Sequence, residues 1–360
     1  MIKKIKLLIL PAFLFLSACQ LFLGQEPDIS PSEVLKSLWN DFNNIHANLD
    51  FRMSNNIRYN SWHDVYYNKQ NGYALKIYPD MSEESLFNVC ANMLKELNDP
   101  HVALYAPGKF ASGYVDNREY INFSVIRSSL KENGNDDYAN FLYGKFSLES
   151  NDIGYIYISS FISEEPEQEG HEWGRAIDKI IDSLASVQAL VLDIRSNRGG
   201  ELFVTEYIAA RFAAEQKDFI KVRTKTGPGP NDLSPPKIFT VRSLKKLSDN
   251  RYGYTKPIVL LTNKNTVSAA EWFTMALRTQ SHVTHVGMPT CGALSSRNDR
   301  FMVNGWLYSI SPERVTDMNG TYYEGIGISP DKEHLIENKT DDEQLEYAIK
   351  LAVKLADGVK

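Results

Sequence analysis

The fold is decided by the stretch ALVLDIRSNRGG, which occupies residues 189–200. Its first half is almost entirely apolar, as expected for a strand buried on both faces of a sheet. Its second half is a polar loop that ends in two glycines, and a helical pattern follows at residues 201–214. Further strands are predicted at 153–161 and 257–262, and further helices at 172–184 and after 265–269 to about 277. This alternation predicts an α/β fold for the core.

The segments outside this core have other patterns. Residues 30–33 read SPSE, which predicts a helix that starts with Ser30 as its cap, proline in its first turn and Glu33 completing a capping box. A second helix is expected at 82–97, followed by short β-like runs over 102–150. Residues 215–256 are rich in Gly and Pro and read as a long surface excursion, which is a candidate lid over the site. A closing helix is expected at 341–356.

The first nineteen residues have the features of a secretory signal. Three lysines precede an apolar run from Leu7 to Leu16, and small residues then lead to Cys19. The run is too short for a good spanning helix, which needs about 20 apolar residues. The segment LSAC at 16–19 resembles a bacterial lipobox, which implies that Cys19 becomes the lipidated N-terminus of a cell-envelope protein on the periplasmic or cell-surface side. The alternative is an ordinary cleaved signal with a chance cysteine.

The composition excludes several classes of function. A net charge of −6 and the absence of basic runs beyond the signal give no reason to expect nucleic acid. Cys90 and Cys291 are too few for a disulfide framework, and we expect two isolated thiols. The chain has no His-Glu-x-x-His pair, no Cys-x-x-Cys pair and no phosphate-binding glycine loop. We therefore expect no metal and no cofactor.

Two loops at the carboxyl ends of the buried strands carry the candidate chemistry, because ligands collect at that edge of a parallel sheet. One ends in Gly199 and Gly200, and the other is TVSAAE at 266–271, which places Ser268 in the first turn of a helix. Taken alone, the first could be a plain turn and the serine a simple helix cap. Together, the amides of Gly199 or Gly200 and of Ala269 could form an oxyanion hole beside the Ser268 hydroxyl.

A serine nucleophile also needs a base. No lysine lies between Asn265 and Asp331, so a nearby lysine base is disfavoured. His101 is the candidate among seven histidines because of the motif LNDPHVAL in which it stands, at 97–104. We interpret the remaining histidines as solvated bystanders: His46, His63, His171, His282, His285 and His334.

Four segments together resemble the tail-specific, or C-terminal-processing, peptidase family. They are residues 97–104, 193–200, 266–271 and the run EGIGISPD at 324–331, and they occur in the family's order. The resemblance covers most of residues 30–335 and implies a crotonase/ClpP-like α/β core. It also implies Ser268 as nucleophile, His101 as general base and Glu324 as the carboxylate of the orienting network.

The resemblance is greater to the tricorn and retinoid-binding-protein branch than to the Ser/Lys branch, since Ala293 stands where the latter carries lysine. Pro100 departs from the tricorn pattern, in which a serine precedes the histidine, and this weakens the proposed link between His101 and Glu324. Residues 105–151 are too short for a normal PDZ domain, so none is expected.

These observations divide the chain into successive parts. They are a signal peptide at 1–18, a lipidated tether at 19–29, a helical subdomain at 30–104, a small β region at 105–150, an α/β peptidase core at 151–340 and a terminal helix at 341–360. The implied function is a serine endopeptidase that acts on peptides or unfolded proteins. The rival interpretation is a non-catalytic surface lipoprotein that binds an apolar ligand or glycan on the same fold. The oligomeric state is not indicated.

Overall fold

The structure is a computed structural model that describes residues 28–113, 121, 126, 140–148, 151–163, 172–242, 253–333 and 342–358. The expected signal peptide, the lipidation site Cys19, His171 and His334 lie outside the described residues. Among the residues described, no helix is both long and apolar enough to cross a membrane.

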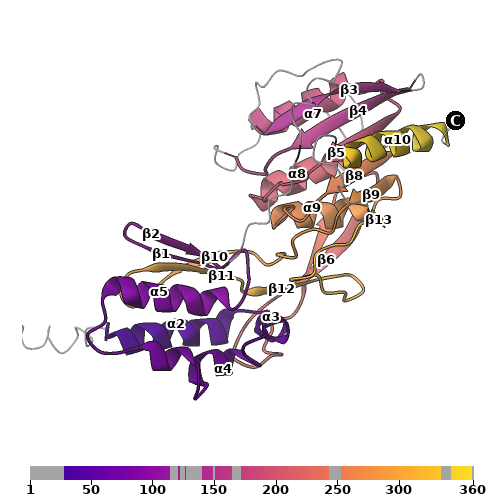
Figure 1. Ribbon diagram of the computed structural model, residues 1–360. Coiled ribbons are helices and arrows are strands. Elements are labelled where there is room, and N and C mark those ends of the chain that lie inside the picture. Colours follow the sequence, from indigo (N-terminus) through magenta and orange to yellow (C-terminus); the bar gives the residue numbers. More distant parts are fainter. Residues whose placement is uncertain are drawn as a thin grey trace, which may run out of the picture.

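The centre of the core is a six-stranded sheet with helices on both faces (Figure 1). Five strands are parallel, and β3 is antiparallel to its neighbour β4. In pairing order the strands are β13 (Lys332–Glu333), β9 (Val283–Gly287), β8 (Ile258–Thr262), β5 (Ala189–Asp193), β4 (Asn151–Ile158) and β3 (Phe141–Leu148). All residues of β5 and β8 are buried, as their apolar sequences predict. The α/β fold class is confirmed.

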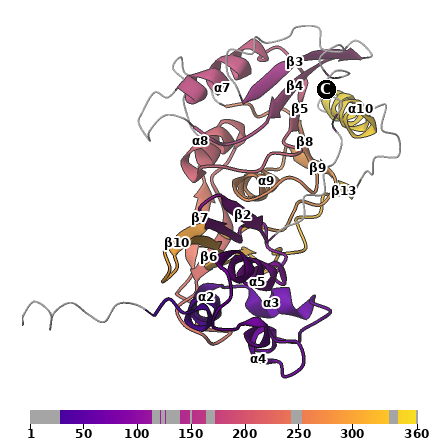
Figure 2. The ribbon, with the colours of Figure 1, turned by 60° about the vertical axis from the view of Figure 1, so that its left-hand side comes forward.

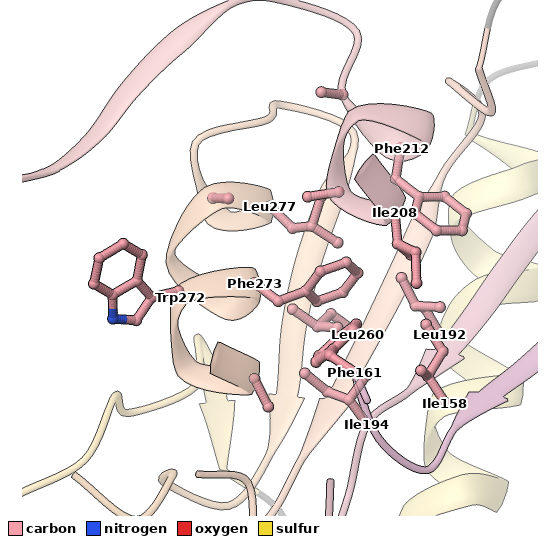
Figure 3. Packing of buried hydrophobic residues seen from close by; sticks show 14 of the residues in the cluster. Ile158, Phe161, Leu192, Ile194, Ile208, Phe212, Leu260, Trp272, Phe273 and Leu277 are labelled. Atoms are coloured by element: carbon pink, nitrogen blue, oxygen red, sulfur yellow. The ribbon is translucent and has the colours of Figure 1, made fainter. Parts of the chain in front are cut away.

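Three helices cover one face of this sheet: α7 (Glu172–Ser183), α8 (Leu202–Phe212) and α9 (Ala269–Arg278). Aromatic side chains fill the layer between them, and the rings of Phe161 and Phe273 lie 5.1 Å apart (Figure 3). Burial of one such side chain contributes about 1.5–3 kcal/mol. The helix α10 (Glu343–Asp357) packs on the opposite face.

A buried charge cluster fastens α10 to the loop after β5. The Arg195 side chain is fully buried, and its Nη2 lies 2.7 Å from Oδ2 of Asp193 and 2.7 Å from Oδ2 of Asp342. Asp342 caps α10 by accepting a hydrogen bond from the Leu345 amide. The start of the loop that leads to the two glycines is thus fixed to the end of β5 and to the first turn of α10.

A second body contains the N-terminal helices and a four-stranded antiparallel sheet (Figure 2). The helical elements are α2 (Pro31–Ile45), α3 (Leu49–Ser54), α4 (Trp62–Tyr67), the 3₁₀ helix η1 (Tyr73–Lys76) and α5 (Glu83–Lys95). The sheet has the order β10 (Asn298–Phe301), β11 (Leu307–Ile310), β1 (Ala103–Ala106) and β2 (Lys109–Ser112). The helix α2 begins at Pro31 as expected, but Ser30 makes no side-chain capping bond.

Two of the expected boundaries differ from the structure. Residues 30–104 do not complete the helical body alone, because residues 298–310 supply two strands and the buried side chains of Trp306 and Tyr308. Residues 105–150 do not form a separate β region: β2 belongs to that second sheet, whereas β3 pairs with β4 over eight residues and so joins the core sheet. The first difference arises from pairing between distant segments, and the second from two hairpins, β1–β2 and β3–β4, whose strands are neighbours in the sequence.

The segment expected as a surface excursion is also structured. It contributes β6 (Lys217–Thr224) and β7 (Lys237–Val241) to a three-stranded sheet with β12 (Glu313–Asp317). β6 pairs with β12 over five residues, and Ile220 and Val222 are buried. β6 therefore belongs to the framework between the two bodies (Figure 1), so this part is no irregular excursion, whereas its role as a lid stays a prediction.

Candidate active site

Ser268 stands in a strained turn between β8 and α9. Its backbone has φ 61° and ψ −125°, a region that costs a side-chain-bearing residue about 1–3 kcal/mol. Such a sharp turn from strand to helix exposes a nucleophile at the end of a sheet. The position also lies at the positive end of the α9 dipole, which favours developing negative charge.

Glu271 holds this turn in place. Its carboxyl group is fully buried and accepts hydrogen bonds from the amides of Ser268 (3.1 Å), Gly292 (2.7 Å) and Ala293 (2.8 Å), and from the Thr290 hydroxyl (2.6 Å). Burial raises the pKa of Glu271, and the four donors oppose that rise. Glu271 is not among the predicted site residues, although its place three residues after Ser268 is the capping-box spacing.

The glycine loop lies directly against the serine turn. The Val267 amide donates to the Asn197 carbonyl at 3.0 Å. A Cβ on Gly199, where φ is +86°, would stand 2.8 Å from the Ala269 nitrogen and 2.9 Å from the Ser268 Cβ. Only glycine permits this approach of the two loops. The structure thus brings Ser268 and Ala269 together with the glycine pair, which lies far from them in the sequence.

The three predicted oxyanion donors differ in availability. The Gly199 amide donates to Oδ1 of Asn197 at 2.8 Å, so it is already used within its loop. Gly200 forms a parallel bridge with Phe161, an arrangement that directs the Gly200 amide away from that partner. In the described ranges neither the Gly200 amide nor the Ala269 amide donates a hydrogen bond. These two amides are the donors that a ligand could use.

His101 lies at the start of β1, in the other body. Its side chain is buried, and its backbone amide donates to Oδ1 of Asp99 at 2.9 Å. Burial lowers the pKa of His101, with Arg52 and Arg297 acting in the same direction and Asp99 opposing them. The imidazole is therefore neutral at neutral pH and able to accept a proton. Its Nδ1 has no hydrogen-bond partner, and no hydrogen bond joins His101 to Ser268 within the described residues.

Glu324 reaches His101 only through other charged groups. Its Oε1 lies 2.9 Å from Nη2 of Arg52. The same Nη2 atom lies 3.8 Å from Oδ1 of Asp99. Its Oε2 accepts the Leu294 amide at 2.9 Å. Burial raises the pKa of Glu324 to about 7, against the opposing effect of Arg52. The carboxylate in contact with the His101 backbone is Asp99, so the direct role that the resemblance implies for Glu324 stays a prediction.

The bystander interpretation of His46 is wrong. His46 is fully buried, and its Nε2 donates to Oδ2 of Asp99 at 2.9 Å, since its Nδ1 accepts the Asn48 amide. Burial raises the pKa of Asp99, but Arg52 and His46 together bring it below its ordinary value. His285 is also fully buried, against Thr262, whereas His63 is exposed as expected. No local pattern marks His46, because its partner lies 53 positions away.

The described chain contains two cysteines and no disulfide between them. Cys90 and Cys291 are thus in line with the expectation of two isolated thiols. In the same residues no group of three or more His, Cys, Asp or Glu side chains is arranged to hold a metal ion.

Comparison with known proteins places the chain in a family. The model of peptidase family S41 matches residues 152–334, which contain both glycines, Ser268 and Glu324. The chain belongs to peptidase family S41. The motif resemblance is thereby confirmed at the level of the family, and the match includes strands β4, β5, β8, β9 and β13 of the core sheet. His101 lies outside the matched residues.

Two curated relatives match parts of the chain. Nisin-resistance protein of Lactococcus lactis subsp. lactis is 26% identical over 142 residues, which are 39% of this chain and 45% of the relative. The carboxy-terminal processing protease CtpB of Bacillus subtilis (strain 168) is 25% identical over 183 residues, 51% of this chain and 34% of the relative. The matched segments therefore span less than half of either relative.

A solved structure matches nearly the whole described fold. A protein of Parabacteroides merdae ATCC 43184, described as a candidate peptidase, is 24% identical with a TM-score of 0.75, and the match covers 91% of this chain and 98% of that one. At this identity the likeness supports the fold alone.

Proposed function

We propose that this member of peptidase family S41 is a serine endopeptidase with Ser268 as nucleophile and His101 as general base. The observation that carries the proposal is the strained Ser268 turn, with the unused amides of Gly200 and Ala269 beside it. A helix cap needs neither the strain nor a second loop of glycines packed against it. Both features serve acyl transfer, in which a serine oxygen attacks and an oxyanion must be held.

The proposed reaction has two halves. His101 takes the hydroxyl proton of Ser268, and the oxygen attacks the peptide carbonyl while two backbone amides hold the oxyanion. The C–N bond then breaks as His101 gives the proton to the leaving amine. A water molecule, deprotonated by His101, cleaves the acyl ester and restores Ser268. The base must come within about 2.6–3.2 Å of the hydroxyl. We therefore propose that bound substrate brings the side chains of His101 and Ser268 together.

The charged groups behind His101 set its proton affinity in this proposal. Asp99 holds the His101 backbone and is itself held by His46, by Arg52 and by the Ser311 hydroxyl at 2.8 Å. Arg52 carries the connection on to Glu324. We assign Asp99 and Glu324 to one orienting network of the tricorn-like type. In this network Arg52 bridges the two carboxylates, which do not contact each other directly.

A direct test is the hydrolysis of an unfolded protein. The purified protein should cleave reduced, alkylated casein into fragments detectable by mass spectrometry, and Ser268→Ala should not. Cleavage of simple esters without any cleavage of casein or peptides would contradict the peptidase assignment. Equal casein cleavage by the parent and Ser268→Ala would contradict Ser268 as nucleophile.

We also propose that Cys19 is lipidated and that the protein is held at the bacterial cell envelope. The basic start, the short apolar run and the segment LSAC at 16–19 support this. Cells grown with an alkyne fatty acid should label the parent and not Cys19→Ala. Equal labelling of both, or of neither while the chain is exported, would contradict a lipid at Cys19.

A further inference from the structure

The four-stranded sheet of the helical body has one face covered by helices. Leu104 and Tyr308, which pair directly across β1 and β11, are fully buried in the same hydrophobic cluster as side chains of α2 and α5. Figures 1 and 2 show α2 and α5 on one side of this sheet, and the core body with α8 and α9 on the other. The second face of the sheet is therefore turned toward the core body.

A row of apolar side chains crosses that second face. Strand pairing places four residues directly opposite one another, one on each strand: Phe301, Leu307, Tyr105 and Phe110. Directly opposite residues share a face, and these alternate with the buried residues of the covered face. We call these four residues the apolar row. With about 4.8 Å between neighbouring strands, the row is about 14 Å long.

The apolar row is accessible to water. Phe301 is 77% exposed and Phe110 is 62% exposed. Among the described residues, no member of the row belongs to a buried hydrophobic cluster. Contiguous exposed apolar side chains on a folded protein mark a surface that binds another molecule.

The row has a polar border on its Tyr105 side. The rings of Tyr105 and Phe110 lie 5.0 Å apart, so the apolar surface is continuous there. Arg297 lies beside it: its Nη2 donates to the Tyr105 hydroxyl at 3.0 Å, and its guanidinium lies 5.6 Å from the centre of the Tyr105 ring. An apolar centre with a polar rim is the usual composition of a surface that binds protein.

The row is connected to the candidate active site along two segments of chain. Tyr105 follows His101 by four residues, which span about 13 Å in an extended chain. Arg297 acts on His101 through its charge, which helps to lower the pKa of that histidine. The strand β10 starts soon after Gly292, whose amide donates to Glu271. A polypeptide bound at His101 therefore reaches the row with about four residues.

The shape and position of the row favour an extended polypeptide as its occupant. An extended chain presents a single line of side chains on one side, about 7 Å apart, which matches a row that is one side chain wide. A membrane or a second globular copy of the chain is broad, whereas the core body stands opposite the row (Figures 1 and 2). Unfolded protein also exposes the apolar side chains that would gain by covering the row.

We propose that the apolar row is a specificity-determining surface, on which an unfolded polypeptide substrate places an aromatic or aliphatic side chain about four residues from the cleaved bond. This inference rests on the proposed peptidase function and adds the feature of the substrate that the protein selects. Bonds with an apolar residue at that distance should be cleaved in preference to others.

The binding test uses Ser268→Ala protein, so that no cleavage takes place. Fluorescence anisotropy of labelled, reduced and alkylated casein should give saturable binding. Adding Phe110→Thr and Phe301→Thr removes both exposed rings, while threonine suits the two edge strands. This double change should raise the Kd for casein at least about tenfold, because two apolar contacts are lost.

A matched control distinguishes the row from exposed apolar surface in general. Leu75 is 62% exposed, as Phe110 is, but lies in η1. Leu75→Thr should bind casein as Ser268→Ala alone does, and urea unfolding shows which variants are folded. An unchanged Kd in the folded double variant, or no casein binding by Ser268→Ala itself, would overturn the proposal. A parent dimer that the double change converts to a monomer in sedimentation would also overturn it, because the row would then hold a second copy of the chain.

The cleavage preference is measured with Ser268 intact. Bonds cut in casein are mapped by mass spectrometry, and apolar residues about four positions from each cut are compared with their frequency in casein. On one side of the cut they should be enriched at least about threefold, and the enrichment should disappear in the double variant but not in Leu75→Thr. A parent map without enrichment would overturn the preference, whether or not the double variant folds.

The two arms separate this inference from the proposed function. Casein that binds through the row but is never cut by the parent would contradict the peptidase and leave the row as a binding surface. Casein that is cut by the parent, with no enrichment and no effect of the double change, would leave the peptidase standing and overturn the role of the row.

Discussion

Replacement of Gly199 by alanine tests the contact between the glycine loop and the serine turn. The new Cβ would stand 2.8 Å from the Ala269 nitrogen and the Val267 carbonyl oxygen, and 2.9 Å from the Ser268 Cβ. The left-handed backbone at φ +86° costs alanine about 1–2 kcal/mol, and relief of the overpacking costs about 1–3 kcal/mol more. We expect Gly199→Ala to lower the free energy of unfolding by about 2–5 kcal/mol.

Gly199→Ala should also slow the reaction of Ser268 with a fluorophosphonate, beyond what its loss of stability alone would cause. The displaced atoms include the Ala269 amide, and loss of one oxyanion donor costs about 10²–10³-fold in rate. The assay is the rate of fluorophosphonate adduct formation, followed by intact mass, beside urea unfolding of the same sample.

Gly305→Ala is the matched control for this variant. Gly305 has φ +81°, but no atom lies within 4 Å of the position of its Cβ. It should therefore lose only the backbone contribution of about 1–2 kcal/mol and keep the parent rate. Equal adduct rates in folded Gly199→Ala and Gly305→Ala would refute the role given to the loop contact.

Three further predictions follow from buried groups. The adduct rate should rise with pH through a midpoint below 6.5, because burial lowers the pKa of His101 and its neutral form is the base; a midpoint above 6.5 in the pH–rate profile would contradict this. Glu271→Gln replaces one carboxylate oxygen by an NH₂ group, which then faces two hydrogen-bond donors. Urea unfolding should show a free energy of unfolding that is lower by about 2–6 kcal/mol, and adduct formation should slow. Arg195→Met should lower the free energy of unfolding by about 3–5 kcal/mol, because it leaves buried carboxylates unpaired. Lys350→Met removes an exposed ion pair and should lower it by less than about 0.5 kcal/mol. Similar losses in the two variants would contradict the importance of burial for the Arg195 cluster.

The sequence predicts the core well because its signals are local. The apolar runs at β5 and β8 exceed what a half-buried strand would carry, and the helical spacing after each run places α8 and α9 within about two residues of their observed starts. The glycine pair and Ser268 were found for the same reason, since each follows a recognisable strand directly.

Most features that the sequence does not predict depend on contacts between distant segments. β1 pairs with β11 across some two hundred residues. The β3–β4 hairpin is local, but its alternating pattern is weak. Arg52 reaches Glu324 across 272 positions, and His46 reaches Asp99 across 53. Periodicity along the chain contains no information on such pairs, so a buried histidine could not be told from a solvated one.

Mapping of a covalent adduct shows whether Ser268 is an activated nucleophile. The purified protein is exposed to a fluorophosphonate, its intact mass is measured, and the modified peptide is sequenced, with Ser268→Ala and His101→Ala treated alongside. We expect one adduct, located on Ser268, which is absent in Ser268→Ala and forms much more slowly in His101→Ala. An unmodified parent, or an adduct that persists in Ser268→Ala, would contradict it.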